Sequence, residues 1–216
     1  YDEIIFADTG GEHPETYAHL QNTIRPFVQQ KGIKFTIVRT SNWKSLEDYC
    51  VETKHFPSWH YRWCTRDFKV RPIRYYLAKL GCQLPAIAVM GISADEPQRM
   101  RNDHPKEFTY EYPLITKGFG RRDCIKVIES FGLAVPPKSG CFYCPYMNKK
   151  QLRAIHDNHP ELWQRRADME KKSRAYPKAH ISAYGSSEQL SMFFGEGNQS
   201  LDDFIEEPCD SGYCMV

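Results

Sequence analysis

The sequence predicts an α/β protein in which a mostly parallel sheet has helices on both faces, followed by a helical C-terminal segment. Two observations predict this fold class. Short β-branched apolar runs alternate along the chain with longer stretches of helical period. Pro stands near the start of the helical stretches and Gly where they end. Because a crossover helix returns the chain to the same end of a sheet, this order favours parallel strands.

The first predicted elements are a strand, a helix and a second strand. The run IIFAD at 4–8 ends in Asp-Thr-Gly-Gly, as a strand that leads into a turn does. A helix is expected between Pro14 and Gly32, and KFTIVRT at 34–40 is the second strand. Residues 41–63 form a long connection rich in aromatic residues, which is too long to be idle in a compact domain.

The later elements continue the alternation. They are a helix at 66–81, a fully buried strand at 85–93, an alternating edge strand at 108–115, a helix at 121–133, and two helices at about 148–158 and 160–175. The tail is expected to be irregular, because it is rich in Gly, Ser and acidic residues.

Composition limits the class of protein. The chain is 41% hydrophobic and 26% charged, which is too apolar and too balanced for a disordered protein. No apolar run approaches the roughly 20 residues of a membrane span, and the first residues do not resemble a signal peptide. We therefore expect a cytoplasmic protein with no membrane partner, in which the eight cysteines are thiols or metal ligands.

Two strand ends predict a ligand-binding crevice. Asp8-Thr9-Gly10 and Gly91-Ile92-Ser93 both follow predicted strands. In parallel sheets the ligand lies outside the carboxyl ends of the strands, so both stretches are expected in one crevice. Gly allows close backbone approach, and Asp or Thr can bind a ribose or phosphate. By itself, the first stretch is better read as a plain β-turn.

A basic cluster surrounds one cysteine. In RWCTRDFKVRP, the cations Arg62, Arg66, Lys69 and Arg71 lie around Cys64. Such a cluster can bind polyphosphate or sulfate, and its charge would lower the pKa of the thiol. The alternative is the solvated face of a helix.

A second charged cluster follows the strand at 85–93. Asp95 and Glu96 could hold Mg²⁺ through carboxylate oxygens, and Arg99 and Arg101 could contact phosphates. The alternative is a helix start with acidic residues in its first turn, and the two readings are evenly balanced.

The stretch SGCFYCP places Cys141 and Cys144 at the Cys-x-x-Cys spacing of a metal-binding turn, which supplies half of a site. Cys64 is a plausible third ligand, and Cys209 or Cys214 could supply the fourth. The remaining cysteines lie in apolar helical patterns and are expected to be small buried hydrophobes; they are Cys50, Cys82 and Cys124.

Two further features have weaker functional readings. His55 and His60 could line a substrate loop, although single histidines are more often structural. The basic residues between 149 and 174 could face nucleic acid, or could simply form a solvated surface, which is slightly favoured.

Several motifs together resemble one family. FADTGGEHPETY, WCTRDFKVRP and GISADEPQRM resemble, in this order, stretches of the phosphoadenosine phosphosulfate (PAPS) reductase-like branch of the PP-loop ATP pyrophosphatases. YPLI and the late SGCFYCP also fall in family order. The resemblance covers roughly residues 1–150, and its specificity lies in the set and its order. It is closest to the branch that resembles DNA-phosphorothioation enzymes.

The resemblance implies a fold, an activity and a set of site residues. The fold is that of the adenine nucleotide alpha hydrolases, with a nucleotide-binding α/β domain at 1–135 and a cysteine-containing helical region and tail at 136–216. The implied activity is activation with ATP or PAPS followed by sulfur transfer, with Mg²⁺ possible. The implied nucleotide contacts are Asp8, Thr9, Gly10, Lys69, Gly91, Glu96 and Arg99. The implied catalytic residues are Cys64, Arg66 and Asp95.

The resemblance also implies a metal centre and partners. Cys64, Cys141 and Cys144 would hold an iron–sulfur cluster, with zinc as the alternative. Cys214 is the expected fourth ligand, although Cys209 or a non-protein ligand could replace it. Expected partners are an adenine nucleotide, a nucleic-acid acceptor, and a cysteine desulfurase or thioredoxin-like protein as sulfur or electron donor.

Three departures from the family leave alternatives open. The family's first strand and its S-G-G-x-x-S phosphate loop are expected in a segment preceding IIFADTG. Ser93 stands where the family has Arg, and PCDSGYCMV stands where sulfonucleotide reductases have E-C-G-x-H. One alternative is a sulfonucleotide reductase that uses Cys209 or Cys214 as its nucleophile. The other is a non-catalytic binding protein stabilised by zinc.

Overall fold

The structure is a computed structural model that describes residues 2–58, 61–100, 106–173 and 181–195 of the 216-residue chain. The strands are β1 (Glu3–Ala7), β2 (Lys34–Val38), β3 (Ala86–Val89) and β4 (Phe108–Glu111). The helices before the Cys-x-x-Cys turn are α1 (Pro14–His19), α2 (Arg25–Gln30), α3 (Leu46–Thr53), α4 (Trp63–Thr65), α5 (Arg71–Lys79), α6 (Pro113–Thr116) and α7 (Arg121–Ser130). Those after it are α8 (Lys149–Asn158), α9 (Pro160–Lys172) and α10 (Ser187–Gly195).

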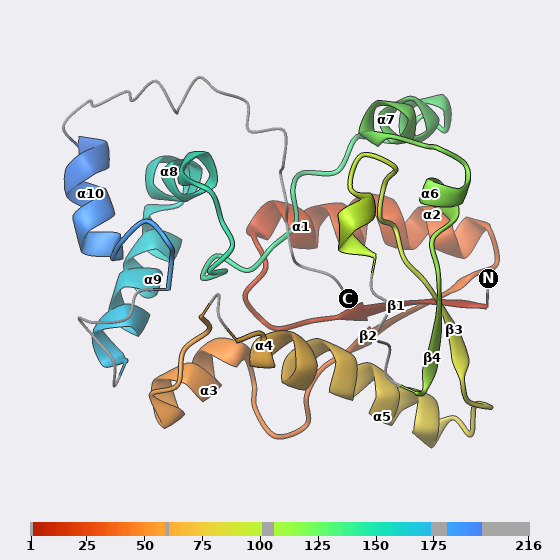
Figure 1. Cartoon of the computed structure of the whole chain (residues 1–216), viewed down its shortest axis with the longest axis horizontal. Helices are drawn as coiled ribbons and strands as arrows, with labels where there is room; N and C mark the ends of the chain where they lie inside the picture. The colour runs from red at the N-terminus through yellow and green to blue at the C-terminus, as the bar shows by residue number, and fades with distance from the viewer. Residues whose placement is uncertain (1, 59–60, 101–105, 174–180, 196–216) are drawn as a thin grey trace.

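The strands form two parallel pairs. β1 pairs with β2 from Glu3 opposite Lys34 onward, and β3 pairs with β4 from Ala86 opposite Phe108 onward. α1 and α2 lie on one side of the strands and α5 on the other (Figure 1). The prediction of an α/β protein with parallel strands is therefore confirmed. A single large sheet is not shown, because within the described residues the two pairs are not hydrogen-bonded to each other.

Two wide helical turns each precede a proline. The segment Leu20–Ile24 joins α1 to α2, and Arg66–Val70 joins α4 to α5, both with π-helical hydrogen bonding. Pro26 and Pro72 follow these segments. A proline inside a helix lacks an N–H and its ring clashes with the carbonyl four residues earlier, and a wider turn accommodates both defects. The two helices predicted on either side of β2 are thus confirmed.

The connection at 41–63 contains a helix that the sequence analysis missed. Ser45 lies at the N-cap of α3, and its hydroxyl accepts a hydrogen bond from the backbone N–H of Asp48 at 3.0 Å. Ser followed three residues later by an acidic residue is a helix-start signal. The signal was hidden by the aromatic residues that surround it, several of which pack into the core.

The strand β3 is not fully buried, contrary to the prediction. Its residues alternate between half-buried and exposed, and the side chain of Ile87 is 65% exposed. An apolar run shows that a strand can be buried on both faces, but the neighbouring elements decide whether it is. The edge strand predicted at 108–115 also ends early, because Pro113 begins α6.

The largest buried cluster lies among α3, the Cys-x-x-Cys turn and the C-terminal helices. Representative members are Leu46, Phe68, Phe142, Leu152 and Met169. These residues come from both sides of the domain boundary predicted at 135. None of the described helices is both long and apolar enough to cross a lipid bilayer.

The six described cysteines differ widely in exposure. Cys50 is fully buried in the core, as predicted. Cys82 is exposed, so its prediction as a buried hydrophobe was wrong; it follows Gly81, which ends the helix with φ +69°. Cys124 is half-buried.

This difference predicts selective thiol modification. Burial, followed by the nearby Cys64 and Glu47, raises the pKa of the Cys50 thiol, so it remains protonated and enclosed. We expect a maleimide to modify Cys82 rapidly in the native protein and to leave Cys50 unmodified until the protein is unfolded. Peptide mass spectrometry after timed labelling measures both rates, and equal rates would contradict the burial of Cys50.

Candidate functional site

The loop after β1 is organised around the carboxylate of Asp8. One oxygen accepts hydrogen bonds from the backbone N–H of Gly10 at 2.8 Å and from the hydroxyl of Tyr17 at 2.7 Å. The other accepts two hydrogen bonds from the guanidinium of Arg39, the Nε bond being 2.9 Å. These bonds join the carboxyl ends of β1 and β2 to α1. Because a carboxylate has about four acceptor sites, Asp8 is fully used within the protein.

Two glycines let other segments lie against this loop. Gly10 has φ +77°, and a Cβ atom there would lie 2.6 Å from the Cβ of Ser45 at the start of α3. A Cβ on Gly11 would lie 2.2 Å from the hydroxyl oxygen of Tyr143. The glycines predicted to approach a ligand therefore approach α3 and the Cys-x-x-Cys turn.

The Cys-x-x-Cys turn is hydrogen-bonded directly to the loop after β1. The sulfur of Cys141 lies 3.0 Å from the hydroxyl of Thr9, and its thiol donates to the carboxylate of Glu12 at 3.6 Å. The backbone N–H of Phe142 donates to the carbonyl of Gly11 at 2.9 Å. The structure thus brings together residues 132 positions apart.

The side chain of Lys69 also lies beside the loop after β1. It is buried, and its Nζ atom is 3.7 Å from the Glu12 carboxylate that also faces Cys141. Glu12 is buried too, so this ion pair is shielded from water. Of the implied nucleotide residues, Asp8, Thr9, Gly10 and Lys69 are therefore gathered around one end of the loop.

A buried cation lies behind the Cys-x-x-Cys turn. The guanidinium of Arg166 on α9 is completely buried and donates to the carbonyl of Phe142 at 3.2 Å, while its Nε and Nη2 atoms have no hydrogen-bond partner among the described residues. Burial lowers the pKa of Arg166, and the charges of Glu170 and Cys144 oppose that effect. Arg165 pairs with Glu47 of α3. The basic stretch at 149–174 is therefore only partly a solvated surface.

The basic cluster around Cys64 is divided between core and solvent. Cys64 packs against the same cluster as Cys141 and Cys144. Arg66, by contrast, is exposed and paired with its neighbour Asp67 at 2.8 Å, which matches the solvated-face alternative. His55 stacks on Trp63 at a ring distance of 4.7 Å.

The second predicted cluster makes local contacts. Asp95 accepts a hydrogen bond from the backbone N–H of Arg121 at the start of α7, and Glu96 pairs with Arg99 at 2.6 Å. Gly91 is exposed, and a Cβ there would contact nothing within 4 Å. These contacts tie residues 91–99 to α7 and do not join Asp95 or Glu96 to the loop after β1. Arg101, His60, Cys209 and Cys214 lie outside the described residues.

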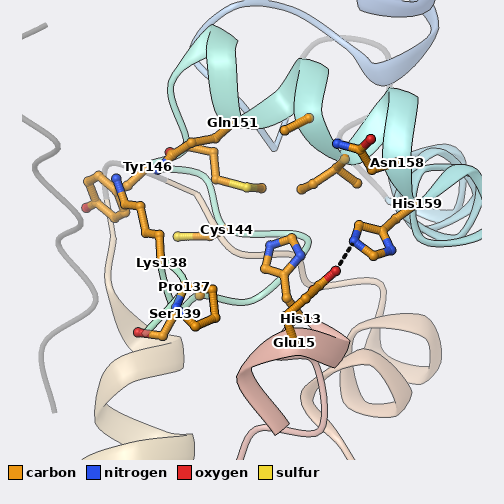
Figure 2. Close-up of a pocket in the computed structure, with 14 residues that line it drawn as sticks. His13, Glu15, Pro137, Lys138, Ser139, Cys144, Tyr146, Gln151, Asn158 and His159 are labelled. Carbon is orange, nitrogen blue, oxygen red and sulfur yellow. Dashed lines mark ion pairs between the residues drawn. The ribbon is translucent and has the colours of Figure 1, made fainter. Parts of the chain in front are cut away.

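A pocket of about 270 Å³ opens beside the Cys-x-x-Cys turn (Figure 2). Its lining includes Cys144, Lys138, His13, Glu15 and His159. Burial lowers the pKa of His13; the charge of Glu15 opposes this effect, and His159 adds a smaller effect in the same direction as burial.

The sequence analysis missed both histidines of the pocket, although the sequence carries a signal. The tripeptide His-Pro-Glu occurs at 13–15 and again at 159–161. In each case the histidine stands at the N-cap of a helix and the glutamate in its first turn. The repeated tripeptide predicts two similar helix starts but cannot show that they face each other.

Comparison with known proteins gives distant relatives. No family model matches the chain, and no solved structure matches it. One protein of Methanocaldococcus jannaschii, named only as uncharacterized, is 23% identical over 208 residues, covering 82% of this chain and 37% of that protein. A second uncharacterized protein of the same organism is 22% identical over 188 residues, covering 79% and 42%. The chain thus spans about two fifths of the length of the curated relatives it matches, and their names assign no activity.

Proposed function

We propose that this protein is a PAPS reductase-like enzyme that uses an adenine nucleotide to activate a substrate and then transfers sulfur. Cys64, Cys141 and Cys144 would hold an iron–sulfur cluster. The observation that carries the proposal is the direct hydrogen bonding of Cys141 to Thr9 at the carboxyl end of β1. This hydrogen bond joins one of the proposed cluster ligands to the carboxyl end of a parallel strand, the end at which ligands bind in such sheets.

In this proposal Lys69 is the cation that meets the anionic substrate, and it exchanges its present partner Glu12 for that substrate. Lys69 supplies a buried positive charge beside the thiol of Cys141, through Glu12. In a site shielded from water, such a charge interacts strongly with a phosphate or a thiolate. In this proposal Asp8 positions the loop rather than contacting the nucleotide, because Arg39, Tyr17 and Gly10 already use its oxygens.

The spacing of the thiols favours a cluster over a single zinc ion. With Zn–S bonds of about 2.3 Å, two thiolates on one zinc lie at most about 4.6 Å apart. Within the described residues, the sulfur atoms of Cys64, Cys141 and Cys144 do not all lie within 4.8 Å of one another. Cluster ligands bind different iron atoms and are spaced more widely. Such a cluster would supply electrons or sulfide to the reaction.

The proposed sulfur acceptor is nucleic acid. Lys150, Lys171 and Lys172 of α8 and α9 are exposed and are not used in the core. They lie on the two helices that follow the Cys-x-x-Cys turn in the chain. In this proposal they contact the phosphate backbone of the nucleic acid.

The cluster is tested by anaerobic purification of the full-length protein with iron, sulfide and visible-absorption measurements. We expect a brown protein whose cluster is lost in Cys141→Ser and in Cys144→Ser. Cys82→Ser is the matched control, because Cys82 is exposed and lies far along the chain from the turn; it should retain the cluster. A colourless protein with one zinc per chain would contradict the cluster.

Nucleotide use is tested separately by calorimetry with ATP and with PAPS on the same preparation. Binding of either supports the enzyme. If neither nucleotide binds, the protein is better described as a non-catalytic metal-stabilised protein.

A further inference from the structure

We propose that His13, Glu15 and His159 bind one divalent transition-metal ion, with zinc the preferred ion, at the wall of the pocket beside the Cys-x-x-Cys turn. This site uses no cysteine, so it is separate from the proposed cluster. Figure 2 shows the three side chains converging from two different parts of the chain.

The three side chains already meet the geometric requirement for a single ion. One ligand atom from each lies within 4.8 Å of the others. The Nε2 atom of His159 is 2.7 Å from a carboxylate oxygen of Glu15. Ligands at about 2.0–2.2 Å from a zinc ion are separated by roughly 3–4 Å, so binding needs only a small outward movement of this pair.

The donor set suits a transition metal better than calcium or magnesium. Two imidazoles and one carboxylate are a recognised three-ligand set for zinc, whereas calcium and magnesium prefer oxygen donors only. The carboxylate contributes one negative charge, which partly neutralises the ion.

An outer carboxylate orients one ligand. Glu161, in the first turn of α9, lies 3.6 Å from the Nδ1 atom of His159. Histidines that bind metals commonly donate their second N–H to a carboxylate, which leaves the other nitrogen directed at the ion. With Nδ1 facing Glu161, the Nε2 atom of His159 faces Glu15 and the proposed site.

A simple ion pair does not account for His13. The pair between Glu15 and His159 is complete without it, and within the described residues the His13 ring makes no hydrogen bond. Its ring centroid nevertheless lies 6.1 Å from that of His159, with the planes tilted by 55°. Two histidines that face one carboxylate are explained if a cation lies among them.

The pocket gives the ion an open position. All three ligands line the cavity of about 270 Å³, so a fourth position is reachable from it. Three protein ligands with one open position are typical of catalytic rather than structural zinc sites. An ion there would polarise an oxygen of a molecule bound in the pocket.

The test is metal titration of chelator-treated full-length protein, with Co²⁺ as a spectroscopic probe and Zn²⁺ followed by calorimetry. We expect the proposed site to bind one ion per chain without the strong charge-transfer band that thiolate ligands produce. An ion held by the cysteines would produce that band and would be lost in Cys141→Ser, so titration of the Cys141→Ser protein measures this site alone whether or not the cluster proposal holds.

Substitutions of the three ligands and of Glu161 should weaken metal binding to different extents. His159→Gln and His13→Gln should weaken binding by more than the roughly 10–100-fold typical of losing an outer-shell partner, and Glu161→Gln by about 10-fold. His156→Gln is the matched control, because His156 also pairs with a carboxylate, that of Asp157 at 2.6 Å, but lies outside the three-residue site.

His13→Gln keeps the test valid if His159→Gln fails to fold, because it removes no hydrogen bond within the described residues. Unchanged affinity in a folded protein that carries both His13→Gln and Cys141→Ser, or failure of the folded Cys141→Ser protein to bind cobalt, would overturn the proposal.

Discussion

Arg166→Met is expected to lower the free energy of unfolding by about 1–3 kcal/mol, the usual cost of leaving a buried polar group without its hydrogen-bond partner. Glu170, one turn further along α9, is buried, and its two oxygens accept hydrogen bonds from the backbone N–H groups of Ile181 and Ser187. Without Arg166 this carboxylate has lost the nearby cation that compensates its charge. The carbonyl of Phe142 loses its donor as well. Urea unfolding followed by circular dichroism measures the loss.

Arg165→Met is the matched control for this substitution. Arg165 precedes Arg166 on the same helix, but its guanidinium is about half exposed and pairs with Glu47 near the surface. Surface pairs contribute at most about 1 kcal/mol, so this variant should be only slightly less stable than the wild type.

A double-mutant cycle identifies the interaction. Arg166→Met combined with Glu170→Gln should cost less than the sum of the two single substitutions, because the double variant leaves no uncompensated buried charge. Strict additivity, or a loss below 1 kcal/mol for Arg166→Met, would show that Arg166 is not the structural cation of this core.

Gly11→Ala is expected to destabilise the protein by at least the 1–3 kcal/mol typical of overpacking a core. The new Cβ would lie 2.2 Å from the hydroxyl oxygen of Tyr143 and 2.4 Å from the ring carbon that bears it. Tyr143 is almost completely buried and stacks edge-on against Phe142, so its ring cannot move aside without disturbing the core. The loop after β1 and the Cys-x-x-Cys turn would have to separate.

Gly140→Ala is the matched control, since a Cβ at Gly140 would contact nothing within 4 Å and Gly140 immediately precedes the same turn. Thermal unfolding of both variants gives the comparison. In addition, Gly11→Ala should impair metal or cluster incorporation at Cys141 while Gly140→Ala should not. Equal stability of the two variants would mean that Tyr143 does not pack on the loop as described.

Local patterns in the sequence were sufficient for most of the elements. The strand at 4–8, the helix between Pro14 and Gly32 and the helix that ends at Gly81 all follow from periodicity and from residues with strong backbone preferences. Such signals act over a few residues, so a single sequence contains them completely. The same reasoning placed Asp8 and Thr9 at the carboxyl end of a strand, where the structure has them.

Burial of a charge is a property that the sequence could not reveal. Arg165 and Arg166 are adjacent in a basic helix and look equivalent, yet one pairs with a residue near the surface and the other is completely enclosed. Which face of a helix is covered depends on the helices that pack against it. Ile87 in β3 is the converse case: an apolar residue predicted to be buried is exposed, because the neighbouring elements do not cover it.

By itself, then, the sequence determined the α/β class and most of the elements, and it offered candidate residues for binding a metal or an anion. Only the tertiary structure decided which of them meet. Cys141 contacts Thr9 across 132 positions, and His159 contacts Glu15 from a different helix, whereas Asp95 caps a helix start instead. The physical reason is that contacts between distant segments depend on how whole helices and strands pack, and no local pattern of residues encodes that packing.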